Sequence, residues 1–209
     1  PVFVADIAHS REELSKFKRI SDQYHFRKQV VIEELKKRNI PLDFDAVIGR
    51  GGLAKPVSSG VFTITKQMII DQQRAIHQHA CDLGCMIADE IARDIPNCKS
   101  FIADPGVVDE MEPEARLSGS PLMPRMCIWH ALNQKAIGRR FAKDMGTSYD
   151  KLNLIICHLG GGISIAAHSH GRAIDTNNAL DGEGPFSPER AGTLPAADLI
   201  HLCFSGKYT

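Results

Sequence analysis

Long hydrophobic runs are missing from this 209-residue sequence, and so is an excess of charge of either sign. No apolar run approaches the roughly 20 residues that a membrane-spanning helix needs, and no basic segment leading into an apolar one stands at the N-terminus. Lys and Arg together number 25 and Asp and Glu 25, which leaves no broad positive field for nucleic acid. We therefore expect a cytoplasmic protein without a membrane or nucleic-acid partner.

Cysteine pairs at metal-binding spacing are also scarce. The six cysteines fall mostly inside apolar segments, which favours reduced core thiols over disulfides. Cys81 and Cys85 are four residues apart on a predicted helix and could suit a metal, but no matching Cys or His pair follows them. A structural zinc site is therefore disfavoured.

Strand-like and helix-like segments alternate along the chain, which predicts an α/β fold. Strands are expected at FDAVIG, which we expect to be buried, and at GVFTIT, SFIADP, LNLIICHL and ISIAAHS. Helices are expected at residues 11–38 with a break near 21, at 66–93 as one helix or two joined near 79, and at 126–145. Ser10 and Glu13 form a capping-box pattern, and the dipeptide HG before RAID predicts a tight hairpin turn.

A loop rich in Pro, Gly and charge, GVVDEMEPEARLSGSPLMPR, follows the SFIADP strand and is the candidate domain boundary. We expect residues 1–105 to belong to a first domain and residues 106–209 to a second. The first residues, PVFVADI, have a strand pattern, and the last, SGKYT, resemble a helix stop followed by a new N-cap. Both domains are therefore expected to be incomplete.

Three consecutive glycines, Gly160 to Gly162, stand between two apolar strand-like segments. This arrangement is not the strand-to-helix arrangement of a Walker loop, and the GKS or GKT signature is absent. A glycine hairpin exposes backbone N–H groups that can bind phosphate oxygens, because no Cβ atoms block the approach. A tight β-turn without a ligand is an equally supported alternative.

Cationic and imidazole side chains lie next to these glycines and in other loops. His158 directly precedes the glycine run. Arg50 and Arg190 each lie among small residues in a loop, where a guanidinium group can bind carboxylate or phosphate. His79 and His130 lie in helical contexts. For each of these residues alone, a packing or ion-pair role is the alternative.

Asp104 ends a strand directly before a proline, where its carboxylate could hold hydrated Mg²⁺ or could cap a turn. Together with the arginines, histidines and glycine hairpin, it makes an electropositive set with no obvious nucleophile paired with a base. That composition favours phosphoryl transfer, in which positioning and charge neutralisation carry most of the catalysis. A carboxylate acceptor fits as well, because it is ionised at neutral pH and needs no general base.

Four segments occur in an order that resembles the butyrate kinase branch of the acetate kinase family, within the actin-like ATPase superfamily: VIGRGGLAKP, ADPGVVDEMEP, IWHALNQKA and CHLGGGISIAAHSHGRAIDTNNALDGEGPFSPERAG. The resemblance runs through nearly the whole chain. It implies duplicated ribonuclease H-like domains and reversible transfer of the ATP γ-phosphoryl group to a short-chain fatty acid, giving acyl phosphate and ADP with Mg²⁺. It also implies a homodimer.

The resemblance implies roles for the candidate residues. His158 would contact the phosphoryl group, and with Gly160, Gly161 and Gly162 it would bind the nucleotide phosphates. The other catalytic positions would be Arg50 and Arg190 on either side of the transferred group, Asp104 at the metal, and His130 in the cleft.

The resemblance also assigns the acid-binding residues to Arg50, Gly51 and His79. Gly51 stands where acetate-using relatives have a larger apolar residue, so it could leave room for extra methylenes, each worth about 0.8 kcal/mol when buried. Comparable turnover of acetate and butyrate would contradict that hypothesis.

Three alternatives stay open. The acid could be acetate, propionate or a branched-chain acid. Because a first phosphate loop of the NPGSTS type and an adenosine-binding segment are missing from these residues, the chain could also be an inactive nucleotide-binding piece, and we expect little kinase activity from it alone. A zinc-dependent hydrolase that uses the histidines is the third and least favoured alternative.

Overall fold

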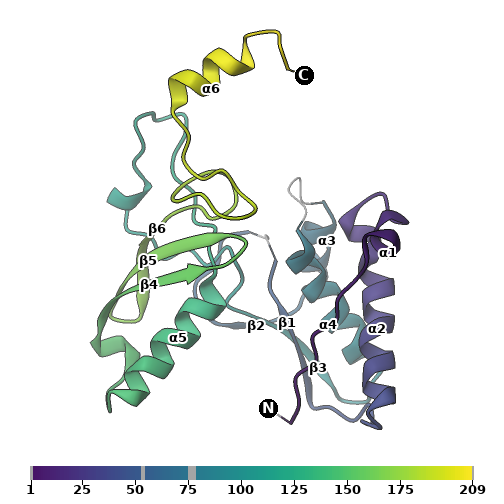
Figure 1. The fold of residues 1–209 in the computed structure, drawn as a ribbon. Coiled ribbons are helices and arrows are strands. Elements are labelled where there is room, and N and C mark those ends of the chain that lie inside the picture. Colours follow the sequence, from purple (N-terminus) through teal and green to yellow (C-terminus); the bar gives the residue numbers. More distant parts are fainter. Residues whose placement is uncertain (1, 53–54, 75–78, 209) are drawn as a thin grey trace. The chain divides into compact units, whose positions relative to one another are not determined.

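The computed structural model describes residues 2–52, 55–74 and 79–208. The chain forms two compact units, the first made of Pro1–Ala54 and Val61–Ala103 and the second of Lys55–Gly60 and Asp104–Thr209. Each unit combines a three-stranded sheet with helices, which confirms the predicted α/β class (Figure 1).

The helices of the first unit are α1 (Arg11–Ser15), η1 (Ile20–Gln23), α2 (Tyr24–Lys37), α3 (Lys66–Arg74), η2 (Ala80–Asp82) and α4 (Leu83–Arg93). The predicted capping box is confirmed, because Ser10 Oγ accepts from the Glu13 N–H while Glu13 Oε2 accepts from the Ser10 N–H. The predicted break near residue 21 is confirmed by η1, and the join near His79 by η2. Residues 75–78, also predicted to be helical, lie outside the described residues.

The sheet of the first unit has the order β1-β3-β2, from β1 (Ala46–Arg50), β2 (Val61–Thr63) and β3 (Lys99–Ala103). β1 runs parallel to β3, and β2 runs antiparallel to it. Helix α4 packs on this sheet, with Cys85 and Ala88 against Ile102 (Figure 1). The prediction that the FDAVIG strand is buried is wrong, because only alternate residues of β1 are even half-buried and Ile48 is 61% exposed.

The second unit contains an antiparallel meander of β4 (Asn153–Leu159), β5 (Ile163–Ser169) and β6 (Arg172–Thr176), with α5 (Ala131–Asp144) beside β4 (Figure 1). Its other helices are η3 (Glu114–Arg116), η4 (Tyr149–Lys151) and α6 (Ala196–Cys203). The predicted HG turn is confirmed, since His170 and Gly171 have φ of 49° and 84°. Left-handed backbone at both central residues is what a two-residue hairpin loop of this kind requires.

Helix α5 begins at Ala131, so the prediction that it begins near Met126 is wrong. The residues before it are held by backbone hydrogen bonds to other segments. The Trp129 N–H donates to Gly106 O at 2.9 Å, and Ile128 O accepts from the Ala179 N–H at 2.8 Å. This pairing buries Trp129 against the core. The C-terminal stop at Gly146, with φ of 69°, is confirmed.

Two of the six cysteines contradict the prediction of core thiols. Cys85 and Cys127 are buried, but Cys157 and Cys203 are exposed. Cys157 lies on the exposed face of β4, and α6, which ends at Cys203, has no buried residue in the part of the chain that is described. None of the helices formed by the described residues is long and apolar enough to cross a membrane.

Candidate active site

The glycine run forms the predicted turn between β4 and β5, whose pairing ends at Leu159 opposite Ile163. The Gly160 N–H donates to Gly162 O at 3.2 Å and closes the turn. None of the three glycines has a positive φ, so their role here is close approach and not an unusual backbone conformation.

Three side chains lie directly on this turn. A Cβ atom added at Gly160 would lie 2.9 Å from His158 Nε2, and one at Gly162 would lie 2.6 Å from Arg190 Nη1. One at Gly161 would lie 2.6 Å from the Glu189 carboxyl carbon. The bare backbone therefore brings an imidazole, a guanidinium and a carboxylate against one turn.

His130 and His158 form a stacked pair beside the turn. Their ring centroids are 3.7 Å apart and their planes differ by 3°. His130 Nδ1 lies 2.8 Å from Ser164 Oγ, and His158 Nδ1 lies 2.9 Å from Asn133 Nδ2. His130 lies at the N-cap of α5 and His158 near the end of β4, so the helix start and the strand end position the two rings together.

A serine holds the loop that carries Arg190 to the glycine turn. Ser187 Oγ donates to Gly161 O at 2.5 Å and accepts from the Arg190 N–H at 3.1 Å. The Ser187 N–H donates to Arg190 O at 2.8 Å, so the two residues close a small loop of their own. The Arg190 side chain is 24% exposed, and its Nη1 lies 3.9 Å from the carboxylate of the more exposed Glu189.

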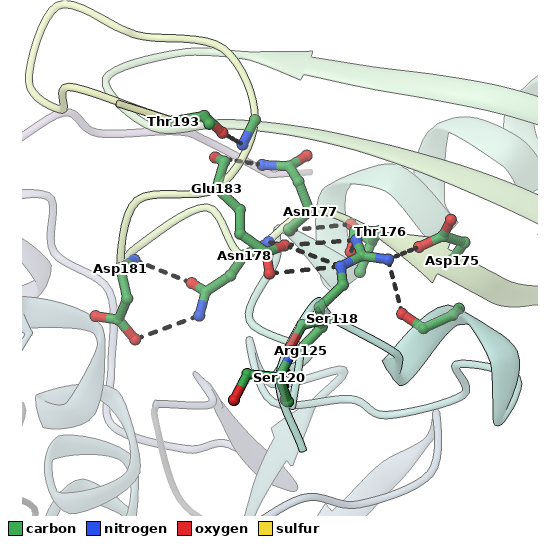
Figure 2. Close-up of polar contacts among 12 residues, drawn as sticks. Ser118, Ser120, Arg125, Asp175, Thr176, Asn177, Asn178, Asp181, Glu183 and Thr193 are labelled. Carbon is green, nitrogen blue, oxygen red and sulfur yellow. Dashed lines mark hydrogen bonds and ion pairs between the residues drawn. The ribbon is translucent and has the colours of Figure 1, made fainter. Parts of the chain in front are cut away.

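The guanidinium group of Arg125 holds the segment between β6 and Arg190 in place (Figure 2). Arg125 donates to Ala115 O at 2.7 Å, to Asp175 Oδ1 at 3.1 Å and to Thr176 O at 2.9 Å, and it pairs with Glu183 at 3.4 Å. Glu183 Oε2 also accepts from the Asn178 N–H at 2.9 Å. This fork is planar and fixed, so its acceptors fix the course of the segment.

Further along the same segment, the side chain of Asn177 lies between two backbones (Figure 2). Asn177 Oδ1 accepts from the Ile165 N–H at 2.7 Å, while its Nδ2 donates to Ile163 O at 3.0 Å and to Glu183 O at 3.2 Å. Thr193 Oγ1 accepts from the Gly184 N–H at 3.0 Å. The segment from β6 to Thr193 is thus tied to β5 by a side chain that pairs like a neighbouring strand.

Asp104 is 7% exposed and lies in the second unit, with a positive φ of 34°. Its Oδ1 accepts from Ser59 Oγ at 2.6 Å and from the Gly60 N–H at 2.9 Å, and its Oδ2 lies 3.4 Å from Arg139 Nη1. One carboxylate oxygen therefore anchors residues 59–60, which is the turn-capping alternative, and the other faces a cation.

Arg50, Gly51 and His79 lie in the first unit. A Cβ on Gly84 would clash with the backbone of Arg50, so helix α4 lies directly against the end of β1. His79 precedes η2, and its Nδ1 accepts from the Cys81 N–H at 3.2 Å. Burial raises the pKa of Cys81 to about 11, and the nearby Arg50 cation opposes that rise. Arg50 and the His79–Cys81 turn are thus neighbours within this unit.

The comparisons with known proteins agree on one family. Residues 125–203 match the Acetokinase family. The whole chain is 62% identical to "Probable butyrate kinase" of Bacteroides thetaiotaomicron and 50% identical to "Butyrate kinase 1" of Clostridium acetobutylicum. The chain is therefore similar to the acetokinase family in this segment and to butyrate kinases along its whole length. It spans 59% of the length of each of these two relatives.

Solved structures of an acetate kinase and a propionate kinase share the fold. An acetate kinase of Porphyromonas gingivalis has a TM-score of 0.63 at 21% identity, over 79% of this chain and 44% of that one. A propionate kinase of Francisella tularensis has a TM-score of 0.66 at 18% identity, over 87% of this chain and 49% of that one.

The acetokinase match includes the residues that the second unit brings together, namely His130, His158, the three glycines and Arg190. Sequence reasoning missed four of their partners: Asn133, Ser164, Ser187 and Glu189. A signal for Ser164 exists in the sequence. Ser164 and His168 are an even number of residues apart in β5, so both polar side chains lie on its buried face. Ser187 and Glu189 carried no such pattern, since loop contacts follow no period.

Proposed function

We propose that the protein is a butyrate kinase, which transfers the γ-phosphoryl group of ATP reversibly to the carboxylate of a short-chain fatty acid. A carboxylate oxygen forms a bond to the γ-phosphorus, and the bond from that phosphorus to the β,γ-bridging oxygen breaks, so ADP leaves with the electron pair. The products are an acyl phosphate and ADP. The observation that carries this proposal is the convergence of two stacked imidazoles and one guanidinium on a bare glycine turn.

The second unit supplies groups suited to the phosphates. Backbone N–H groups of the glycine turn would bind phosphate oxygens, and His158 and His130 would donate hydrogen bonds to the group in transfer. Arg190 would neutralise part of the developing charge, because a guanidinium keeps its proton in proteins. The carboxylate of Glu189 lies against Gly161, where it would repel a phosphate group. The Glu189 side chain is largely exposed, so it has room to turn away when phosphate binds.

The residues fit Mg²⁺ only as an ion that arrives with the nucleotide. Among the described residues, no group of three or more His, Cys, Asp or Glu side chains could hold a metal ion. Mg²⁺ bound to ATP needs few protein ligands, because phosphates and water complete its shell. Oδ2 of Asp104 is the oxygen we assign to it, directly or through water, since Oδ1 is engaged by Ser59 and Gly60. The exposed Arg139, whose Nη1 lies 3.4 Å from Oδ2, would have to move aside for the ion. Such an ion would neutralise phosphate charge during transfer.

Arg50, Gly51 and His79 are proposed to bind the acid. Gly51 is buried, and its missing side chain would leave room for the methylenes of butyrate. A homodimer, implied by the resemblance, belongs to the same proposal and is tested by sedimentation of the purified protein.

The test is acyl phosphate formation by the protein expressed from its natural gene. With ATP and Mg²⁺, butyrate should be phosphorylated faster than acetate, and His158→Gln and Arg190→Gln should each lose most of that activity. Faster turnover of acetate, propionate or isobutyrate would transfer the assignment to another acid. Absence of acyl phosphate with all four acids would overturn the proposal.

A further inference from the structure

A line of polar side chains runs through the second unit from η4 to His130. Tyr149 Oη lies 2.5 Å from His168 Nδ1, and His168 Nε2 lies 2.9 Å from Gln134 Oε1. Gln134 Nε2 lies 2.8 Å from Ser164 Oγ, which lies 2.8 Å from His130 Nδ1. Tyr149, His168, Gln134 and Ser164 are all buried, so these groups satisfy one another and not water.

The direction of this line follows from a backbone carbonyl. Gln134 Nε2 also lies 3.0 Å from Ser164 O. A carbonyl oxygen only accepts, so the amide atom facing it is the NH₂ group. The other amide atom, Oε1, is then an acceptor, and His168 must carry its proton on Nε2. His168 Nδ1 is left as the acceptor of the Tyr149 hydroxyl proton.

The same reasoning places the proton of Ser164. Its Oγ accepts one hydrogen of the Gln134 amide and the His130 backbone N–H, at 2.8 and 3.3 Å. Both lone pairs are then used, so the hydroxyl hydrogen is left to donate to His130 Nδ1. A neutral imidazole that accepts at Nδ1 carries its hydrogen on Nε2.

His168, next to the Tyr149 end of the line, is held in one protonation state. Burial lowers the pKa of His168 to about 4, so this imidazole is neutral at physiological pH. Its ring also lies edge-on to Trp129, with centroids 5.6 Å apart. The direction of the hydrogen bonds cannot reverse without leaving a buried donor facing another donor.

We propose that Tyr149, His168, Gln134 and Ser164 are positioning residues that hold His130 as a neutral imidazole with its proton on Nε2. His130 then acts as a hydrogen-bond donor and not as a base. Its stacked neighbour is arranged in the same way, because Asn133 Nδ2 donates to His158 Nδ1. Two neutral donors stack without the charge repulsion that two imidazolium rings would have at 3.7 Å.

The catalytic part of this inference rests on the proposed function, since donors at Nε2 suit a phosphoryl group whose charge must be stabilised. The tautomer itself does not rest on it. A purely structural role for the buried line would fix the same tautomer of His130, because it follows from matching donors with acceptors. It would leave kcat unchanged when that tautomer is lost, so the kinetics of a variant in the line separate the two roles.

The experiment is nitrogen NMR of the protein labelled with ¹⁵N in its histidine rings, near pH 7 and without nucleotide. Bare and protonated ring nitrogens resonate far apart, and a His130→Gln variant assigns the His130 signals. We expect a bare Nδ1 and a protonated Nε2 for His130. A protonated Nδ1, or an imidazolium ring, would overturn the proposal whether or not the protein is a kinase.

Ser164→Ala tests the link between the line and His130. Gln134 keeps a partner in this variant, because it still donates to the backbone carbonyl of residue 164. The His130 signals should move toward a mixture of tautomers, and kcat for acyl phosphate formation should fall about tenfold or more with little change in KM. Ser169→Ala, on the same strand, is the matched control and should change neither. An unchanged His130 tautomer in Ser164→Ala would overturn the proposal, whereas a changed tautomer in a protein without kinase activity would contradict only the proposed function.

Discussion

Ser187 donates a hydrogen bond from its hydroxyl to the carbonyl oxygen of Gly161 at 2.5 Å, which joins the loop of Arg190 to the glycine turn. The same oxygen accepts the Arg190 N–H, so one small side chain determines where the guanidinium lies relative to the turn. The site is therefore assembled by contacts between a hairpin and a loop more than 20 residues further along the chain.

Ser187→Ala should separate positioning from folding. Loss of the hydroxyl removes three hydrogen bonds at a half-buried site, one of them long, so we expect destabilisation of about 1 kcal/mol and a roughly tenfold loss of kcat. Thermal unfolding and steady-state kinetics measure the two effects. Ser205→Ala, which removes a hydroxyl near the end of α6, is the control for kinetics. Equal kcat in the two variants would show that Ser187 does not position Arg190.

Gly162→Ala should damage activity more than stability. The new methyl would lie 2.6 Å from Arg190 Nη1, the movable end of a long side chain, so the fold can adjust while the guanidinium is displaced. We expect kcat to fall by about 10²-fold, the scale for loss of one charge-stabilising donor. Gly119→Ala is the matched control, since a Cβ there meets no atom within 4 Å. Full activity of Gly162→Ala would mean that the site tolerates displacement of Arg190.

Glu189→Gln should strengthen phosphate binding. The carboxylate of Glu189 lies on Gly161 and 3.9 Å from Arg190, where it competes with an incoming anion. Since the carboxylate is exposed, the gain should be modest, about two- to fivefold in KM for ATP. Glu114→Gln, at the start of η3, serves as the control for a general change in charge. An increase in KM for Glu189→Gln would instead assign this carboxylate a favourable role in binding.

Arg125 should contribute mainly to the order of the loop. Arg125→Met leaves two carbonyl oxygens without this donor and Glu183 without its cation, so we expect a loss of about 2–4 kcal/mol of unfolding free energy. Arg125→Lys should recover only part of it, because an ammonium cannot reproduce the fork. Denaturant titration measures this, with the exposed Arg140→Met as control. Equal stability of the Lys variant and the unsubstituted protein would contradict the network in Figure 2.

His168 should make the fold sensitive to acid. Its pKa is lowered to about 4 by burial, whereas an unfolded histidine titrates near 6.5. Unfolding then takes up a proton between these two values, so stability is full above pH 6.5 and falls as the pH drops toward 4, by roughly 3 kcal/mol in all. Unfolding free energies at pH 7 and pH 5, with His168→Gln as comparison, measure this slope. A His168 ring that is charged at pH 5.5 would contradict it.

Local chemistry and motif likeness predicted much of the molecule. The capping box at Ser10, the glycine hairpin and the His170–Gly171 turn each depend on neighbouring residues, and each was found where the sequence placed it. The start of α5 was not predictable in this way. Residues 126–130 have helical hydrophobic spacing, but the backbone of Trp129 pairs with Gly106, a partner distant in sequence.

The partners of the site residues were harder to predict than the residues themselves. His130 and His158 stand out in the sequence, but their stacking depends on the register of β4 against β5 and on where α5 begins. The role of Ser164 depends on an amide of Gln134, whose orientation is decided by a backbone carbonyl. Contacts of this kind arise from tertiary packing and produce no regular pattern in the sequence.

The most direct test of the central claim is a crystal structure of the protein expressed from its natural gene, with MgADP, a planar fluoride mimic of the transferred phosphoryl group, and butyrate. We predict that the mimic lies on the Gly160–Gly162 turn, within hydrogen-bond distance of Nε2 of His130 or His158 and of the Arg190 guanidinium. A mimic bound away from this turn, or touching none of these three side chains, would contradict the account.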